Sequence, residues 1–245
     1  MSDEELAVEE SPKRLLVPAT VVATAAVSVS TSILTLFVVD VASTFHVPVG
    51  VASQLATVNH AGVLVFGLLM SVLVVRFRHK SLMLAGVLIT IIAAIGNFYT
   101  PDLFIMQIFF VMEGIGTAIV GIMSTTLIGD LLPPKNRASA VSYVFATGWI
   151  MALISIPWSG FIANVAGWRF VFILQMLPLS LAGLILAFFA IPSKSHGPTM
   201  RVKKVSPVES FKQILTDKSA TACLASGVLS IAGPGMAIFG VALYR

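Results

Sequence analysis

One acidic residue, Glu113, lies inside the apolar stretch from Leu103 to Leu127. About twenty apolar residues are enough for a helix to cross a bilayer, and a carboxylate at the centre of such a helix costs roughly 2.5–3.5 kcal/mol. We therefore expect Glu113 to face a cavity or a partner rather than lipid. Since burial disfavours the charged form of a carboxyl group, Glu113 is a candidate proton or substrate site. The alternative is a carboxyl that only bonds a neighbouring helix.

Other polar side chains are expected at the depth of Glu113. At about 1.5 Å per residue, Glu113 lies about 15 Å, and His60 about 14 Å, from the outer start of its helix. We consider His60 a candidate partner of Glu113, although an interhelical hydrogen bond is the more frequent role of such a histidine. The candidate pathway residues are Glu113, His60, Asn59, Ser28, Thr31 and Asp40.

Five hydroxyl side chains share one face of the first expected helix. They are Thr20, Thr24, Ser28, Thr31 and Thr35, spaced by three or four residues. This spacing places them in one row, where they either line a pathway or bond to the carbonyl one turn earlier.

These residues must be positioned by a bundle of membrane-spanning helices. The chain is 57% hydrophobic and 11% charged, with a mean hydropathy of +0.98, whereas soluble domains are about 45–50% apolar and about 25% charged. Long continuous apolar runs favour helices over a membrane β-barrel, whose strands alternate. We therefore predict an all-α integral membrane protein. The expected spans are Val17–Val39, Val51–Val75, Ser81–Phe98, Leu103–Leu127, Ala138–Ala163, Phe170–Ala190 and Ala220–Tyr244.

The segments outside these spans are polar. We expect a cytoplasmic tail over residues 1–16 that is disordered from Met1 to Pro12, a six-helix domain over 17–190, a cytoplasmic linker over 191–219 and a seventh span over 220–245. Within the linker, Ser206-Pro207-Val208-Glu209 combines an N-cap, an N1 proline and a capping-box acid, which predicts a short amphipathic helix on the membrane surface.

The positive charges fix the orientation. With the first tail inside the cell, 13 of the 15 Lys and Arg residues fall on the cytoplasmic side, and only Arg169 and Arg245 fall outside. The 13 are Lys13, Arg14, Arg76, Arg78, Lys80, Lys135, Arg137, Lys194, Arg201, Lys203, Lys204, Lys212 and Lys218. The positive-inside rule then predicts a multi-pass protein of the plasma or inner membrane with a cytoplasmic N-terminus. It also explains the basic pI without nucleic acid as a partner.

Sequence patterns for enzymatic chemistry are missing. There is no metal-spaced set of His and Cys, no glycine-rich phosphate loop and no nucleophile triad, and Cys223 is the one cysteine. We therefore expect neither a cofactor nor an enzyme.

Three stretches resemble motifs of one known family. The stretch Asp130 to Ala138 is similar to a cytoplasmic loop with an acid, a proline and Arg-x-x-Ala. The stretch Gly167 to Phe172 is similar to the Gly-Trp-Arg sequence that opens a sixth helix. The turn Arg76 to Lys80 resembles a cytoplasmic signature in degenerate form. The family is the major facilitator superfamily of secondary transporters. The resemblance covers about Val17 to Tyr244 and implies six helices in 3+3 inverted repeats, the central linker and the first helix of a second half.

The resemblance also implies a function. The expected protein moves a small solute by alternating access as a symporter or antiporter. The proton is the candidate coupling ion. Two departures bear on the substrate: Phe110 and Glu113 stand where the family often has Arg and Gln, and Pro157 and Gly160 are what is left of the drug antiporter signature.

Residue roles carried over from the family lie at the cytoplasmic ends of the helices. By resemblance, ion pairs that close an inner gate are assigned to Arg76, Lys80, Asp130 and Arg137, with Arg76 and Asp130 foremost; the alternative is charges that only signal topology. Helix bending or close packing is expected at Gly114, Gly116, Pro157, Gly160 and Pro234.

The expected partners follow from the length. The chain holds one half and one further helix, so we expect a fragment that lacks its second half, or a half-size subunit that pairs with another chain, in contact with lipid, a small solute and protons. A seven-helix receptor or sensor is the alternative, but it would normally place its first tail outside the cell.

Overall fold

A computed structural model describes residues 3–192, and every regular element in that range is a helix. The elements are α1 (Asp3–Thr44), α2 (Val49–Ala52), α3 (Gln54–Arg76), α4 (His79–Tyr99), α5 (Leu103–Leu131), α6 (Pro134–Ala166), the π-helical turn η1 (Phe172–Met176) and α7 (Leu177–Ala190). The predicted all-α fold is confirmed for these residues. The linker, the seventh span and Pro234 lie outside them.

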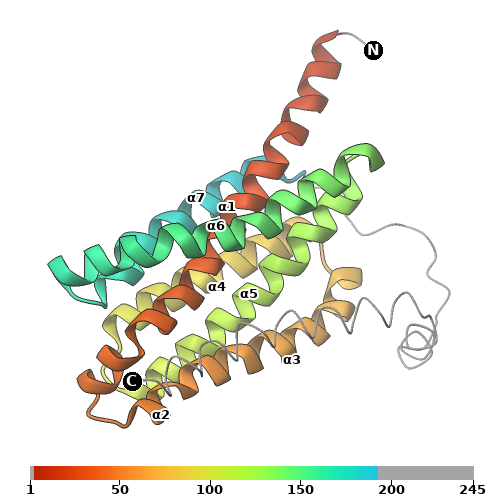
Figure 1. The fold of residues 1–245 in the computed structure, drawn as a ribbon. Helices are drawn as coiled ribbons and strands as arrows, with labels where there is room; N and C mark the ends of the chain where they lie inside the picture. The colour runs from red at the N-terminus through yellow and green to blue at the C-terminus, as the bar shows by residue number, and fades with distance from the viewer. Residues whose placement is uncertain (1–2, 193–245) are drawn as a thin grey trace. The chain divides into compact units, whose positions relative to one another are not determined.

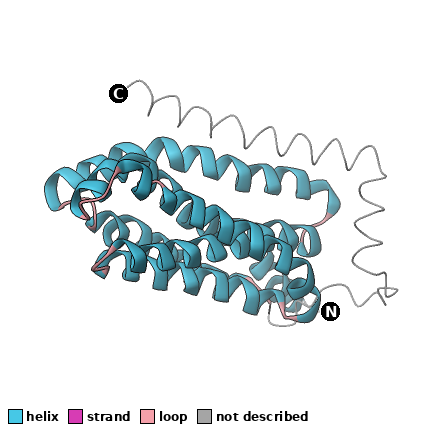
Figure 2. Ribbon diagram, turned by 90° about the horizontal axis from the view of Figure 1, so that it is seen from below, coloured by secondary structure: helices cyan, strands magenta, loops and turns pink. Residues whose placement is uncertain are grey.

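The long helices run back and forth along a common direction, with their loops at the two ends of the bundle (Figures 1 and 2). Helix α5 packs mainly against α3 and α4, and α1 packs mainly against α6 and α7. We call the end with Arg76–Lys80 and Lys135–Arg137 the basic end. The other end, with the loop after Thr44 and the turn at Gly167, is called the opposite end.

Local sequence features explain where several helices begin and end. The Asp102 carboxylate accepts the backbone N–H of Ile105 at 2.9 Å and caps the start of α5, as a side-chain oxygen at an N-cap does. Pro134 occupies the first turn of α6, where the missing N–H of proline costs nothing. Gly167 ends α6 with a φ of 98°, a conformation that glycine adopts without strain.

The helix bounds differ from the predicted spans in three places. Helix α1 begins at Asp3 and extends beyond the bundle (Figure 1), whereas disorder was predicted for Met1 to Pro12. The acids in its first turn favour a helix start. The second span is divided at Ser53 into α2 and α3. The sixth begins with η1, in which the Leu177 N–H bonds to the Phe172 carbonyl.

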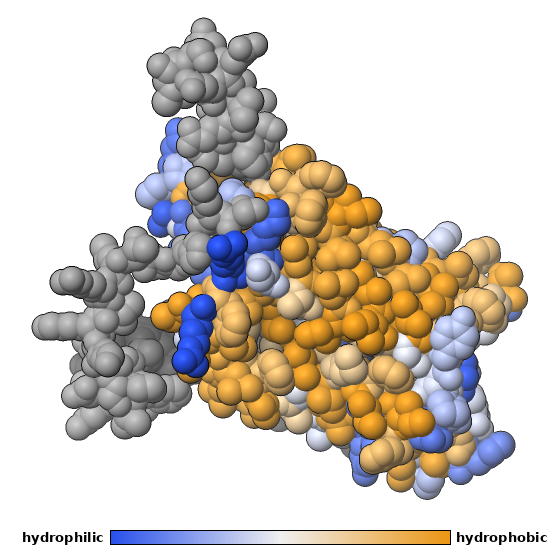
Figure 3. Space-filling model, turned by 180° about the vertical axis from the view of Figure 1, so that it is seen from behind, coloured by the Kyte–Doolittle hydropathy of each residue, from blue (hydrophilic) through white to orange (hydrophobic). Residues whose placement is uncertain are grey.

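The apolar surface of the bundle fits a bilayer. Five helices in the described range are long and apolar enough to cross a membrane, and α1 adds the apolar stretch Leu15–Ser30. Figure 3 shows apolar residues covering most of one face, while hydrophilic residues gather toward its ends. Because such a surface is stable only in contact with lipid or protein, the helices form a multi-pass membrane bundle.

Candidate functional site: a buried carboxyl within the bundle

Glu113 lies near the middle of α5 and is fully buried, with 0% of its surface exposed. Ser30 of α1 lies beside its carboxyl group, but neither carboxylate oxygen has a hydrogen bond of good geometry to any described residue. An isolated charge is costly in such surroundings. This conformation therefore suits the neutral acid, and Glu113 faces the interior of the bundle rather than lipid.

Glycines bring the neighbouring helices close to this turn of α5. A Cβ atom on Gly114 would collide with the Asn59 carbonyl oxygen of α3, and one on Gly116 would collide with the Thr90 hydroxyl of α4. Asn59 is buried, and its Nδ2 donates to the Phe110 carbonyl at 3.1 Å. The small residues thus allow α3 and α4 to pack closely against α5 beside Glu113, as small residues do between membrane helices.

The structure does not bring His60 to Glu113. The His60 ring is exposed, and its Nδ1 lies 2.7 Å from the Ala56 carbonyl on its own helix. A helix turns by about 100° per residue, so the face of α3 that places Asn59 against α5 directs His60 elsewhere. The prediction that His60 is the partner of Glu113 was therefore wrong for this conformation, and Asn59 is the residue of the pair that contacts α5.

Of the described hydroxyls in the row on α1, two bond to their own helix and one contacts a neighbouring helix. Thr20 and Ser28 bond to carbonyls of their own helix, Ser28 to that of Thr24 at 2.8 Å. The Thr24 hydroxyl instead lies 3.4 Å from that of Ser124 on α5. The side chains of Thr31 and Thr35 lie outside the described part of the structure. Asp40 is exposed near the end of α1 and lines a cavity there.

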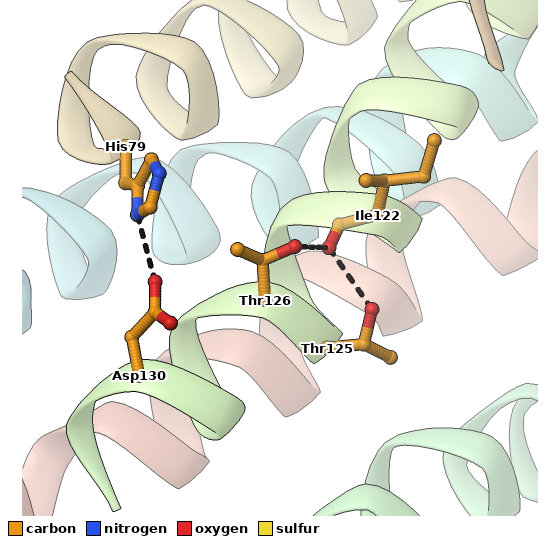
Figure 4. A network of polar contacts seen from close by, with 5 residues as sticks. All are labelled: His79, Ile122, Thr125, Thr126 and Asp130. Carbon is orange, nitrogen blue, oxygen red and sulfur yellow. Dashed lines mark hydrogen bonds and ion pairs between the residues drawn. The ribbon is translucent and has the colours of Figure 1, made fainter. Parts of the chain in front are cut away.

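At the basic end, Asp130 faces a histidine rather than an arginine (Figure 4). His79, at the start of α4, is fully buried, and its Nδ1 lies 3.1 Å from Oδ2 of Asp130 near the end of α5. The two groups are in contact without hydrogen-bond geometry. The predicted pairing of Asp130 with Arg76 was therefore wrong for this conformation. Arg76 is exposed at the last position of α3.

Two other residues assigned to the gate hold helix ends. The Lys80 ammonium donates to the Phe188 carbonyl at 2.6 Å and lies 4.7 Å from the centre of the Phe188 ring. Arg137 Nε donates to the Leu132 carbonyl at 2.9 Å. The last carbonyls of a helix have no partner within it, and a cation there also favours the helix dipole. Lys80 thus caps α7, and Arg137 caps α5.

A buried polar cluster between α6 and η1 escaped the sequence analysis. The Gln175 side chain accepts a hydrogen bond from the Ser159 hydroxyl at 2.6 Å and approaches the Ser155 hydroxyl with its Nε2 at 2.7 Å. All three residues are buried. Pro157 lies between the two serines, and Pro178 follows the turn that carries Gln175. The prolines were a signal for this region, because they disturb helix hydrogen bonding where π turns form.

Gly160 was expected to bend a helix or allow close packing, but it borders open space. A Cβ atom there would meet nothing within 4 Å, so Gly160 makes no close helix contact in this structure. It lines the same cavity as Asp40.

Comparison with known proteins identifies one family. A family model described as Major Facilitator Superfamily matches residues 20–244. Over 189 residues the chain is 22% identical to YfhI, an uncharacterised MFS-type transporter of Bacillus subtilis (strain 168), covering 77% of this chain and 47% of YfhI.

Two fungal proteins are also similar to the chain. It is 26% identical over 113 residues to pyiT of Pyricularia grisea, named an MFS-type efflux transporter, covering 46% of this chain and 19% of pyiT. It is 27% identical over 151 residues to the MFS-type protein mpsC of Macrophomina phaseolina (strain MS6), covering 61% of this chain and 29% of mpsC. The aligned part thus spans less than half the length of each of these three relatives.

Proposed function

Because this chain belongs to the Major Facilitator Superfamily, we propose that it is one half of a secondary transporter that moves a small solute and binds the coupled proton at Glu113. Members with two halves work by rocking one helix bundle against the other around a site near the bilayer midplane. Residues 20–190 supply the first bundle, and its N-terminus lies in the cytoplasm.

The burial of Glu113 is the observation that supports proton coupling. Carboxyl groups within membrane helices are rare and occur in proton relays, and this one has no partner among the described residues that would neutralise a charge. The enclosed conformation holds the neutral acid. When the helices part and water enters, the carboxylate is hydrated and releases its proton. Opening toward one side and then the other would then carry a proton across the membrane.

The test uses the complete protein in proteoliposomes that contain a pH-sensitive dye, with small solutes added one at a time. A coupled solute changes the internal pH in the wild type. Glu113→Gln is expected to abolish this change while exchange of the same solute across the membrane persists. Glu9→Gln, in the acidic N-terminal stretch, is the matched control and should behave as the wild type. An undiminished pH change in Glu113→Gln would remove Glu113 from the coupling step.

The second half is the partner we propose for the bundle. The relatives are more than twice as long as their aligned segments, which supports a further bundle in the same polypeptide or in a separate subunit. The molar mass of the detergent-purified protein separates these cases, since a subunit co-purifies with a second chain. The family match does not favour the seven-helix receptor.

A further inference from the structure

A cavity of about 370 Å³ opens at the opposite end of the bundle. Ligand sites for small molecules have volumes of about 300–1,000 Å³, so this cavity is large enough for a compact organic molecule. It lies between the last turns of α1 and α6 and the turn that follows α6. Its lining consists of Leu36, Phe37, Asp40, Gly160, Ala163, Asn164, Gly167 and Trp168.

The cavity walls are held in place by contacts outside it. Gly167, with its φ of 98°, reverses the chain after α6. The Trp168 indole Nε1 then donates to the Thr44 hydroxyl of α1 at 3.1 Å. Phe37 is buried in the apolar core behind the cavity. Gly160 borders open space, because a Cβ atom there would meet nothing within 4 Å.

The charge in the cavity is negative. The Asp40 side chain is exposed, and the bonds at this residue from the Ser43 and Thr44 hydroxyls go to its backbone carbonyl, at 2.8 and 2.7 Å. Its carboxylate makes no ion pair with another described residue. Arg169 follows Trp168 in the chain but is not part of the lining. Its guanidinium lies over the Phe45 and Trp168 rings, 5.5 and 5.3 Å from their centres.

A carboxylate beside aromatic and aliphatic side chains suits an organic cation with apolar groups. The carboxylate attracts the positive charge, and Leu36, Phe37 and Trp168 offer apolar contact. We propose that this cavity is a recognition site for an organic cation at the mouth of the transport path, with Asp40 as the residue that selects the charge. The proposal rests on the transport function inferred above and names a substrate class for it.

The test measures binding and does not depend on proton coupling. The complete protein in phosphatidylcholine nanodiscs is dialysed against tetraphenylphosphonium or tetraphenylborate, two ions of similar shape and opposite charge, with empty discs subtracted. We expect the cation to bind and Asp40→Asn to weaken it about fivefold, as for an exposed charge pair. Asp102→Asn is the control, because Asp102 is an aspartate of the same end outside the cavity, and asparagine also caps a helix.

A second variant fills the cavity. Gly160→Leu places apolar atoms where nothing stands within 4 Å of the Cβ position, so it should fold and exclude both ions. Thermal unfolding verifies that each variant is folded. If Gly160→Leu does not fold, the binding measured with Asp40→Asn tests the proposal by itself. Equal binding of the two ions, no effect of Asp40→Asn, or full binding in folded Gly160→Leu would overturn the cation site. None of these results would affect the proton experiment on Glu113.

Discussion

Glu113 and the hydroxyls of α1 differ in how their polar atoms find hydrogen-bond partners. Thr20 and Ser28 bond to carbonyls of their own helix, so their burial needs no neighbour. A carboxylate accepts hydrogen bonds only, and the backbone N–H groups of a helix interior are already used. Glu113 therefore depends on protonation or on another helix. This difference makes one acidic residue more informative about function than a row of five hydroxyls.

The contact between His79 and Asp130 predicts an energetic coupling. Removing the carboxylate leaves the buried ring without the acidic group that it contacts, so Asp130→Ala should destabilise the bundle by about 1 kcal/mol, within the range for residues in contact. The double-mutant cycle of His79→Ala with Asp130→Ala, followed by denaturant unfolding in micelles, should give a coupling of about 0.5–1.5 kcal/mol.

Arg76 supplies the control for that cycle. If Asp130 interacts with His79 in the dominant state, the cycle of Arg76→Ala with Asp130→Ala gives a coupling near zero. A larger coupling with Arg76 than with His79 would contradict the observed pairing and restore the gate assigned by resemblance.

At the scale of helices, two glycines of α5 let neighbouring helices approach because they have no side chain. Gly114 approaches the backbone of α3 and Gly116 approaches α4, whereas Gly121 on the same helix meets nothing within 4 Å. The three residues look alike in the sequence, so only the packing separates a glycine that is required from one that is not.

This contrast predicts opposite effects of one substitution. Gly114→Ala should lower the unfolding temperature of the purified bundle, because the added methyl group collides with the rigid backbone of α3 rather than with a flexible side chain. Gly121→Ala should leave it unchanged or raise it slightly, since alanine favours a helix by about 1 kcal/mol over glycine. Equal effects at the two positions would show that α3 and α5 do not approach as described.

The cluster around Gln175 predicts a second effect at this scale. Gln175→Leu leaves two buried serines without their partner, and hydrogen bonds between membrane helices contribute about 0.6 kcal/mol on average and up to about 1.7 kcal/mol. We expect a loss of about 1–2 kcal/mol in the free energy of unfolding. Gln54→Leu, the same change at an exposed residue, should have little effect. Similar losses for both variants would contradict the role of the cluster.

Apart from the start of α1 and the break at Ser53, the ends of the described helices were predictable from the sequence to within a few residues, and the contacts between helices were not. Apolar runs, the cap at Asp102 and the proline at Pro134 are local signals, so the fourth and fifth spans were placed well. The pairing of His79 with Asp130 joins residues 51 positions apart, and no local pattern indicates it. His60 and Asn59 are neighbours in sequence, and the rotation of α3 alone decides which of them contacts α5.

At the scale of the molecule, the positive charges and the apolar surface together predict an orientation. The basic end carries Arg76, Lys80 and Arg137, and the opposite end carries Asp40 and Asp102. Basic loops stay in the cytoplasm when a membrane protein is inserted. The loop between α5 and α6 should therefore face the cytoplasm, and the loop between α4 and α5 should face outward.

Single cysteines test this orientation in a Cys223→Ser background. A cysteine at Pro101, in the loop before α5, should react with a membrane-impermeant maleimide on intact cells. A cysteine at Asn136, in the first turn of α6 and exposed, should react only after the membrane is permeabilised. The reverse labelling pattern would show that the bundle has the opposite orientation in the membrane, with the Asp40 cavity on the cytoplasmic side.

Infrared absorption of the complete protein at neutral pH tests the proton on Glu113 most directly, because a protonated carboxyl group has a carbonyl stretch that a carboxylate lacks. If the enclosed Glu113 is the neutral acid, the wild type and Glu9→Gln show this band and Glu113→Gln loses it. An identical band in Glu113→Gln, or no such band in the wild type, would contradict the proton site.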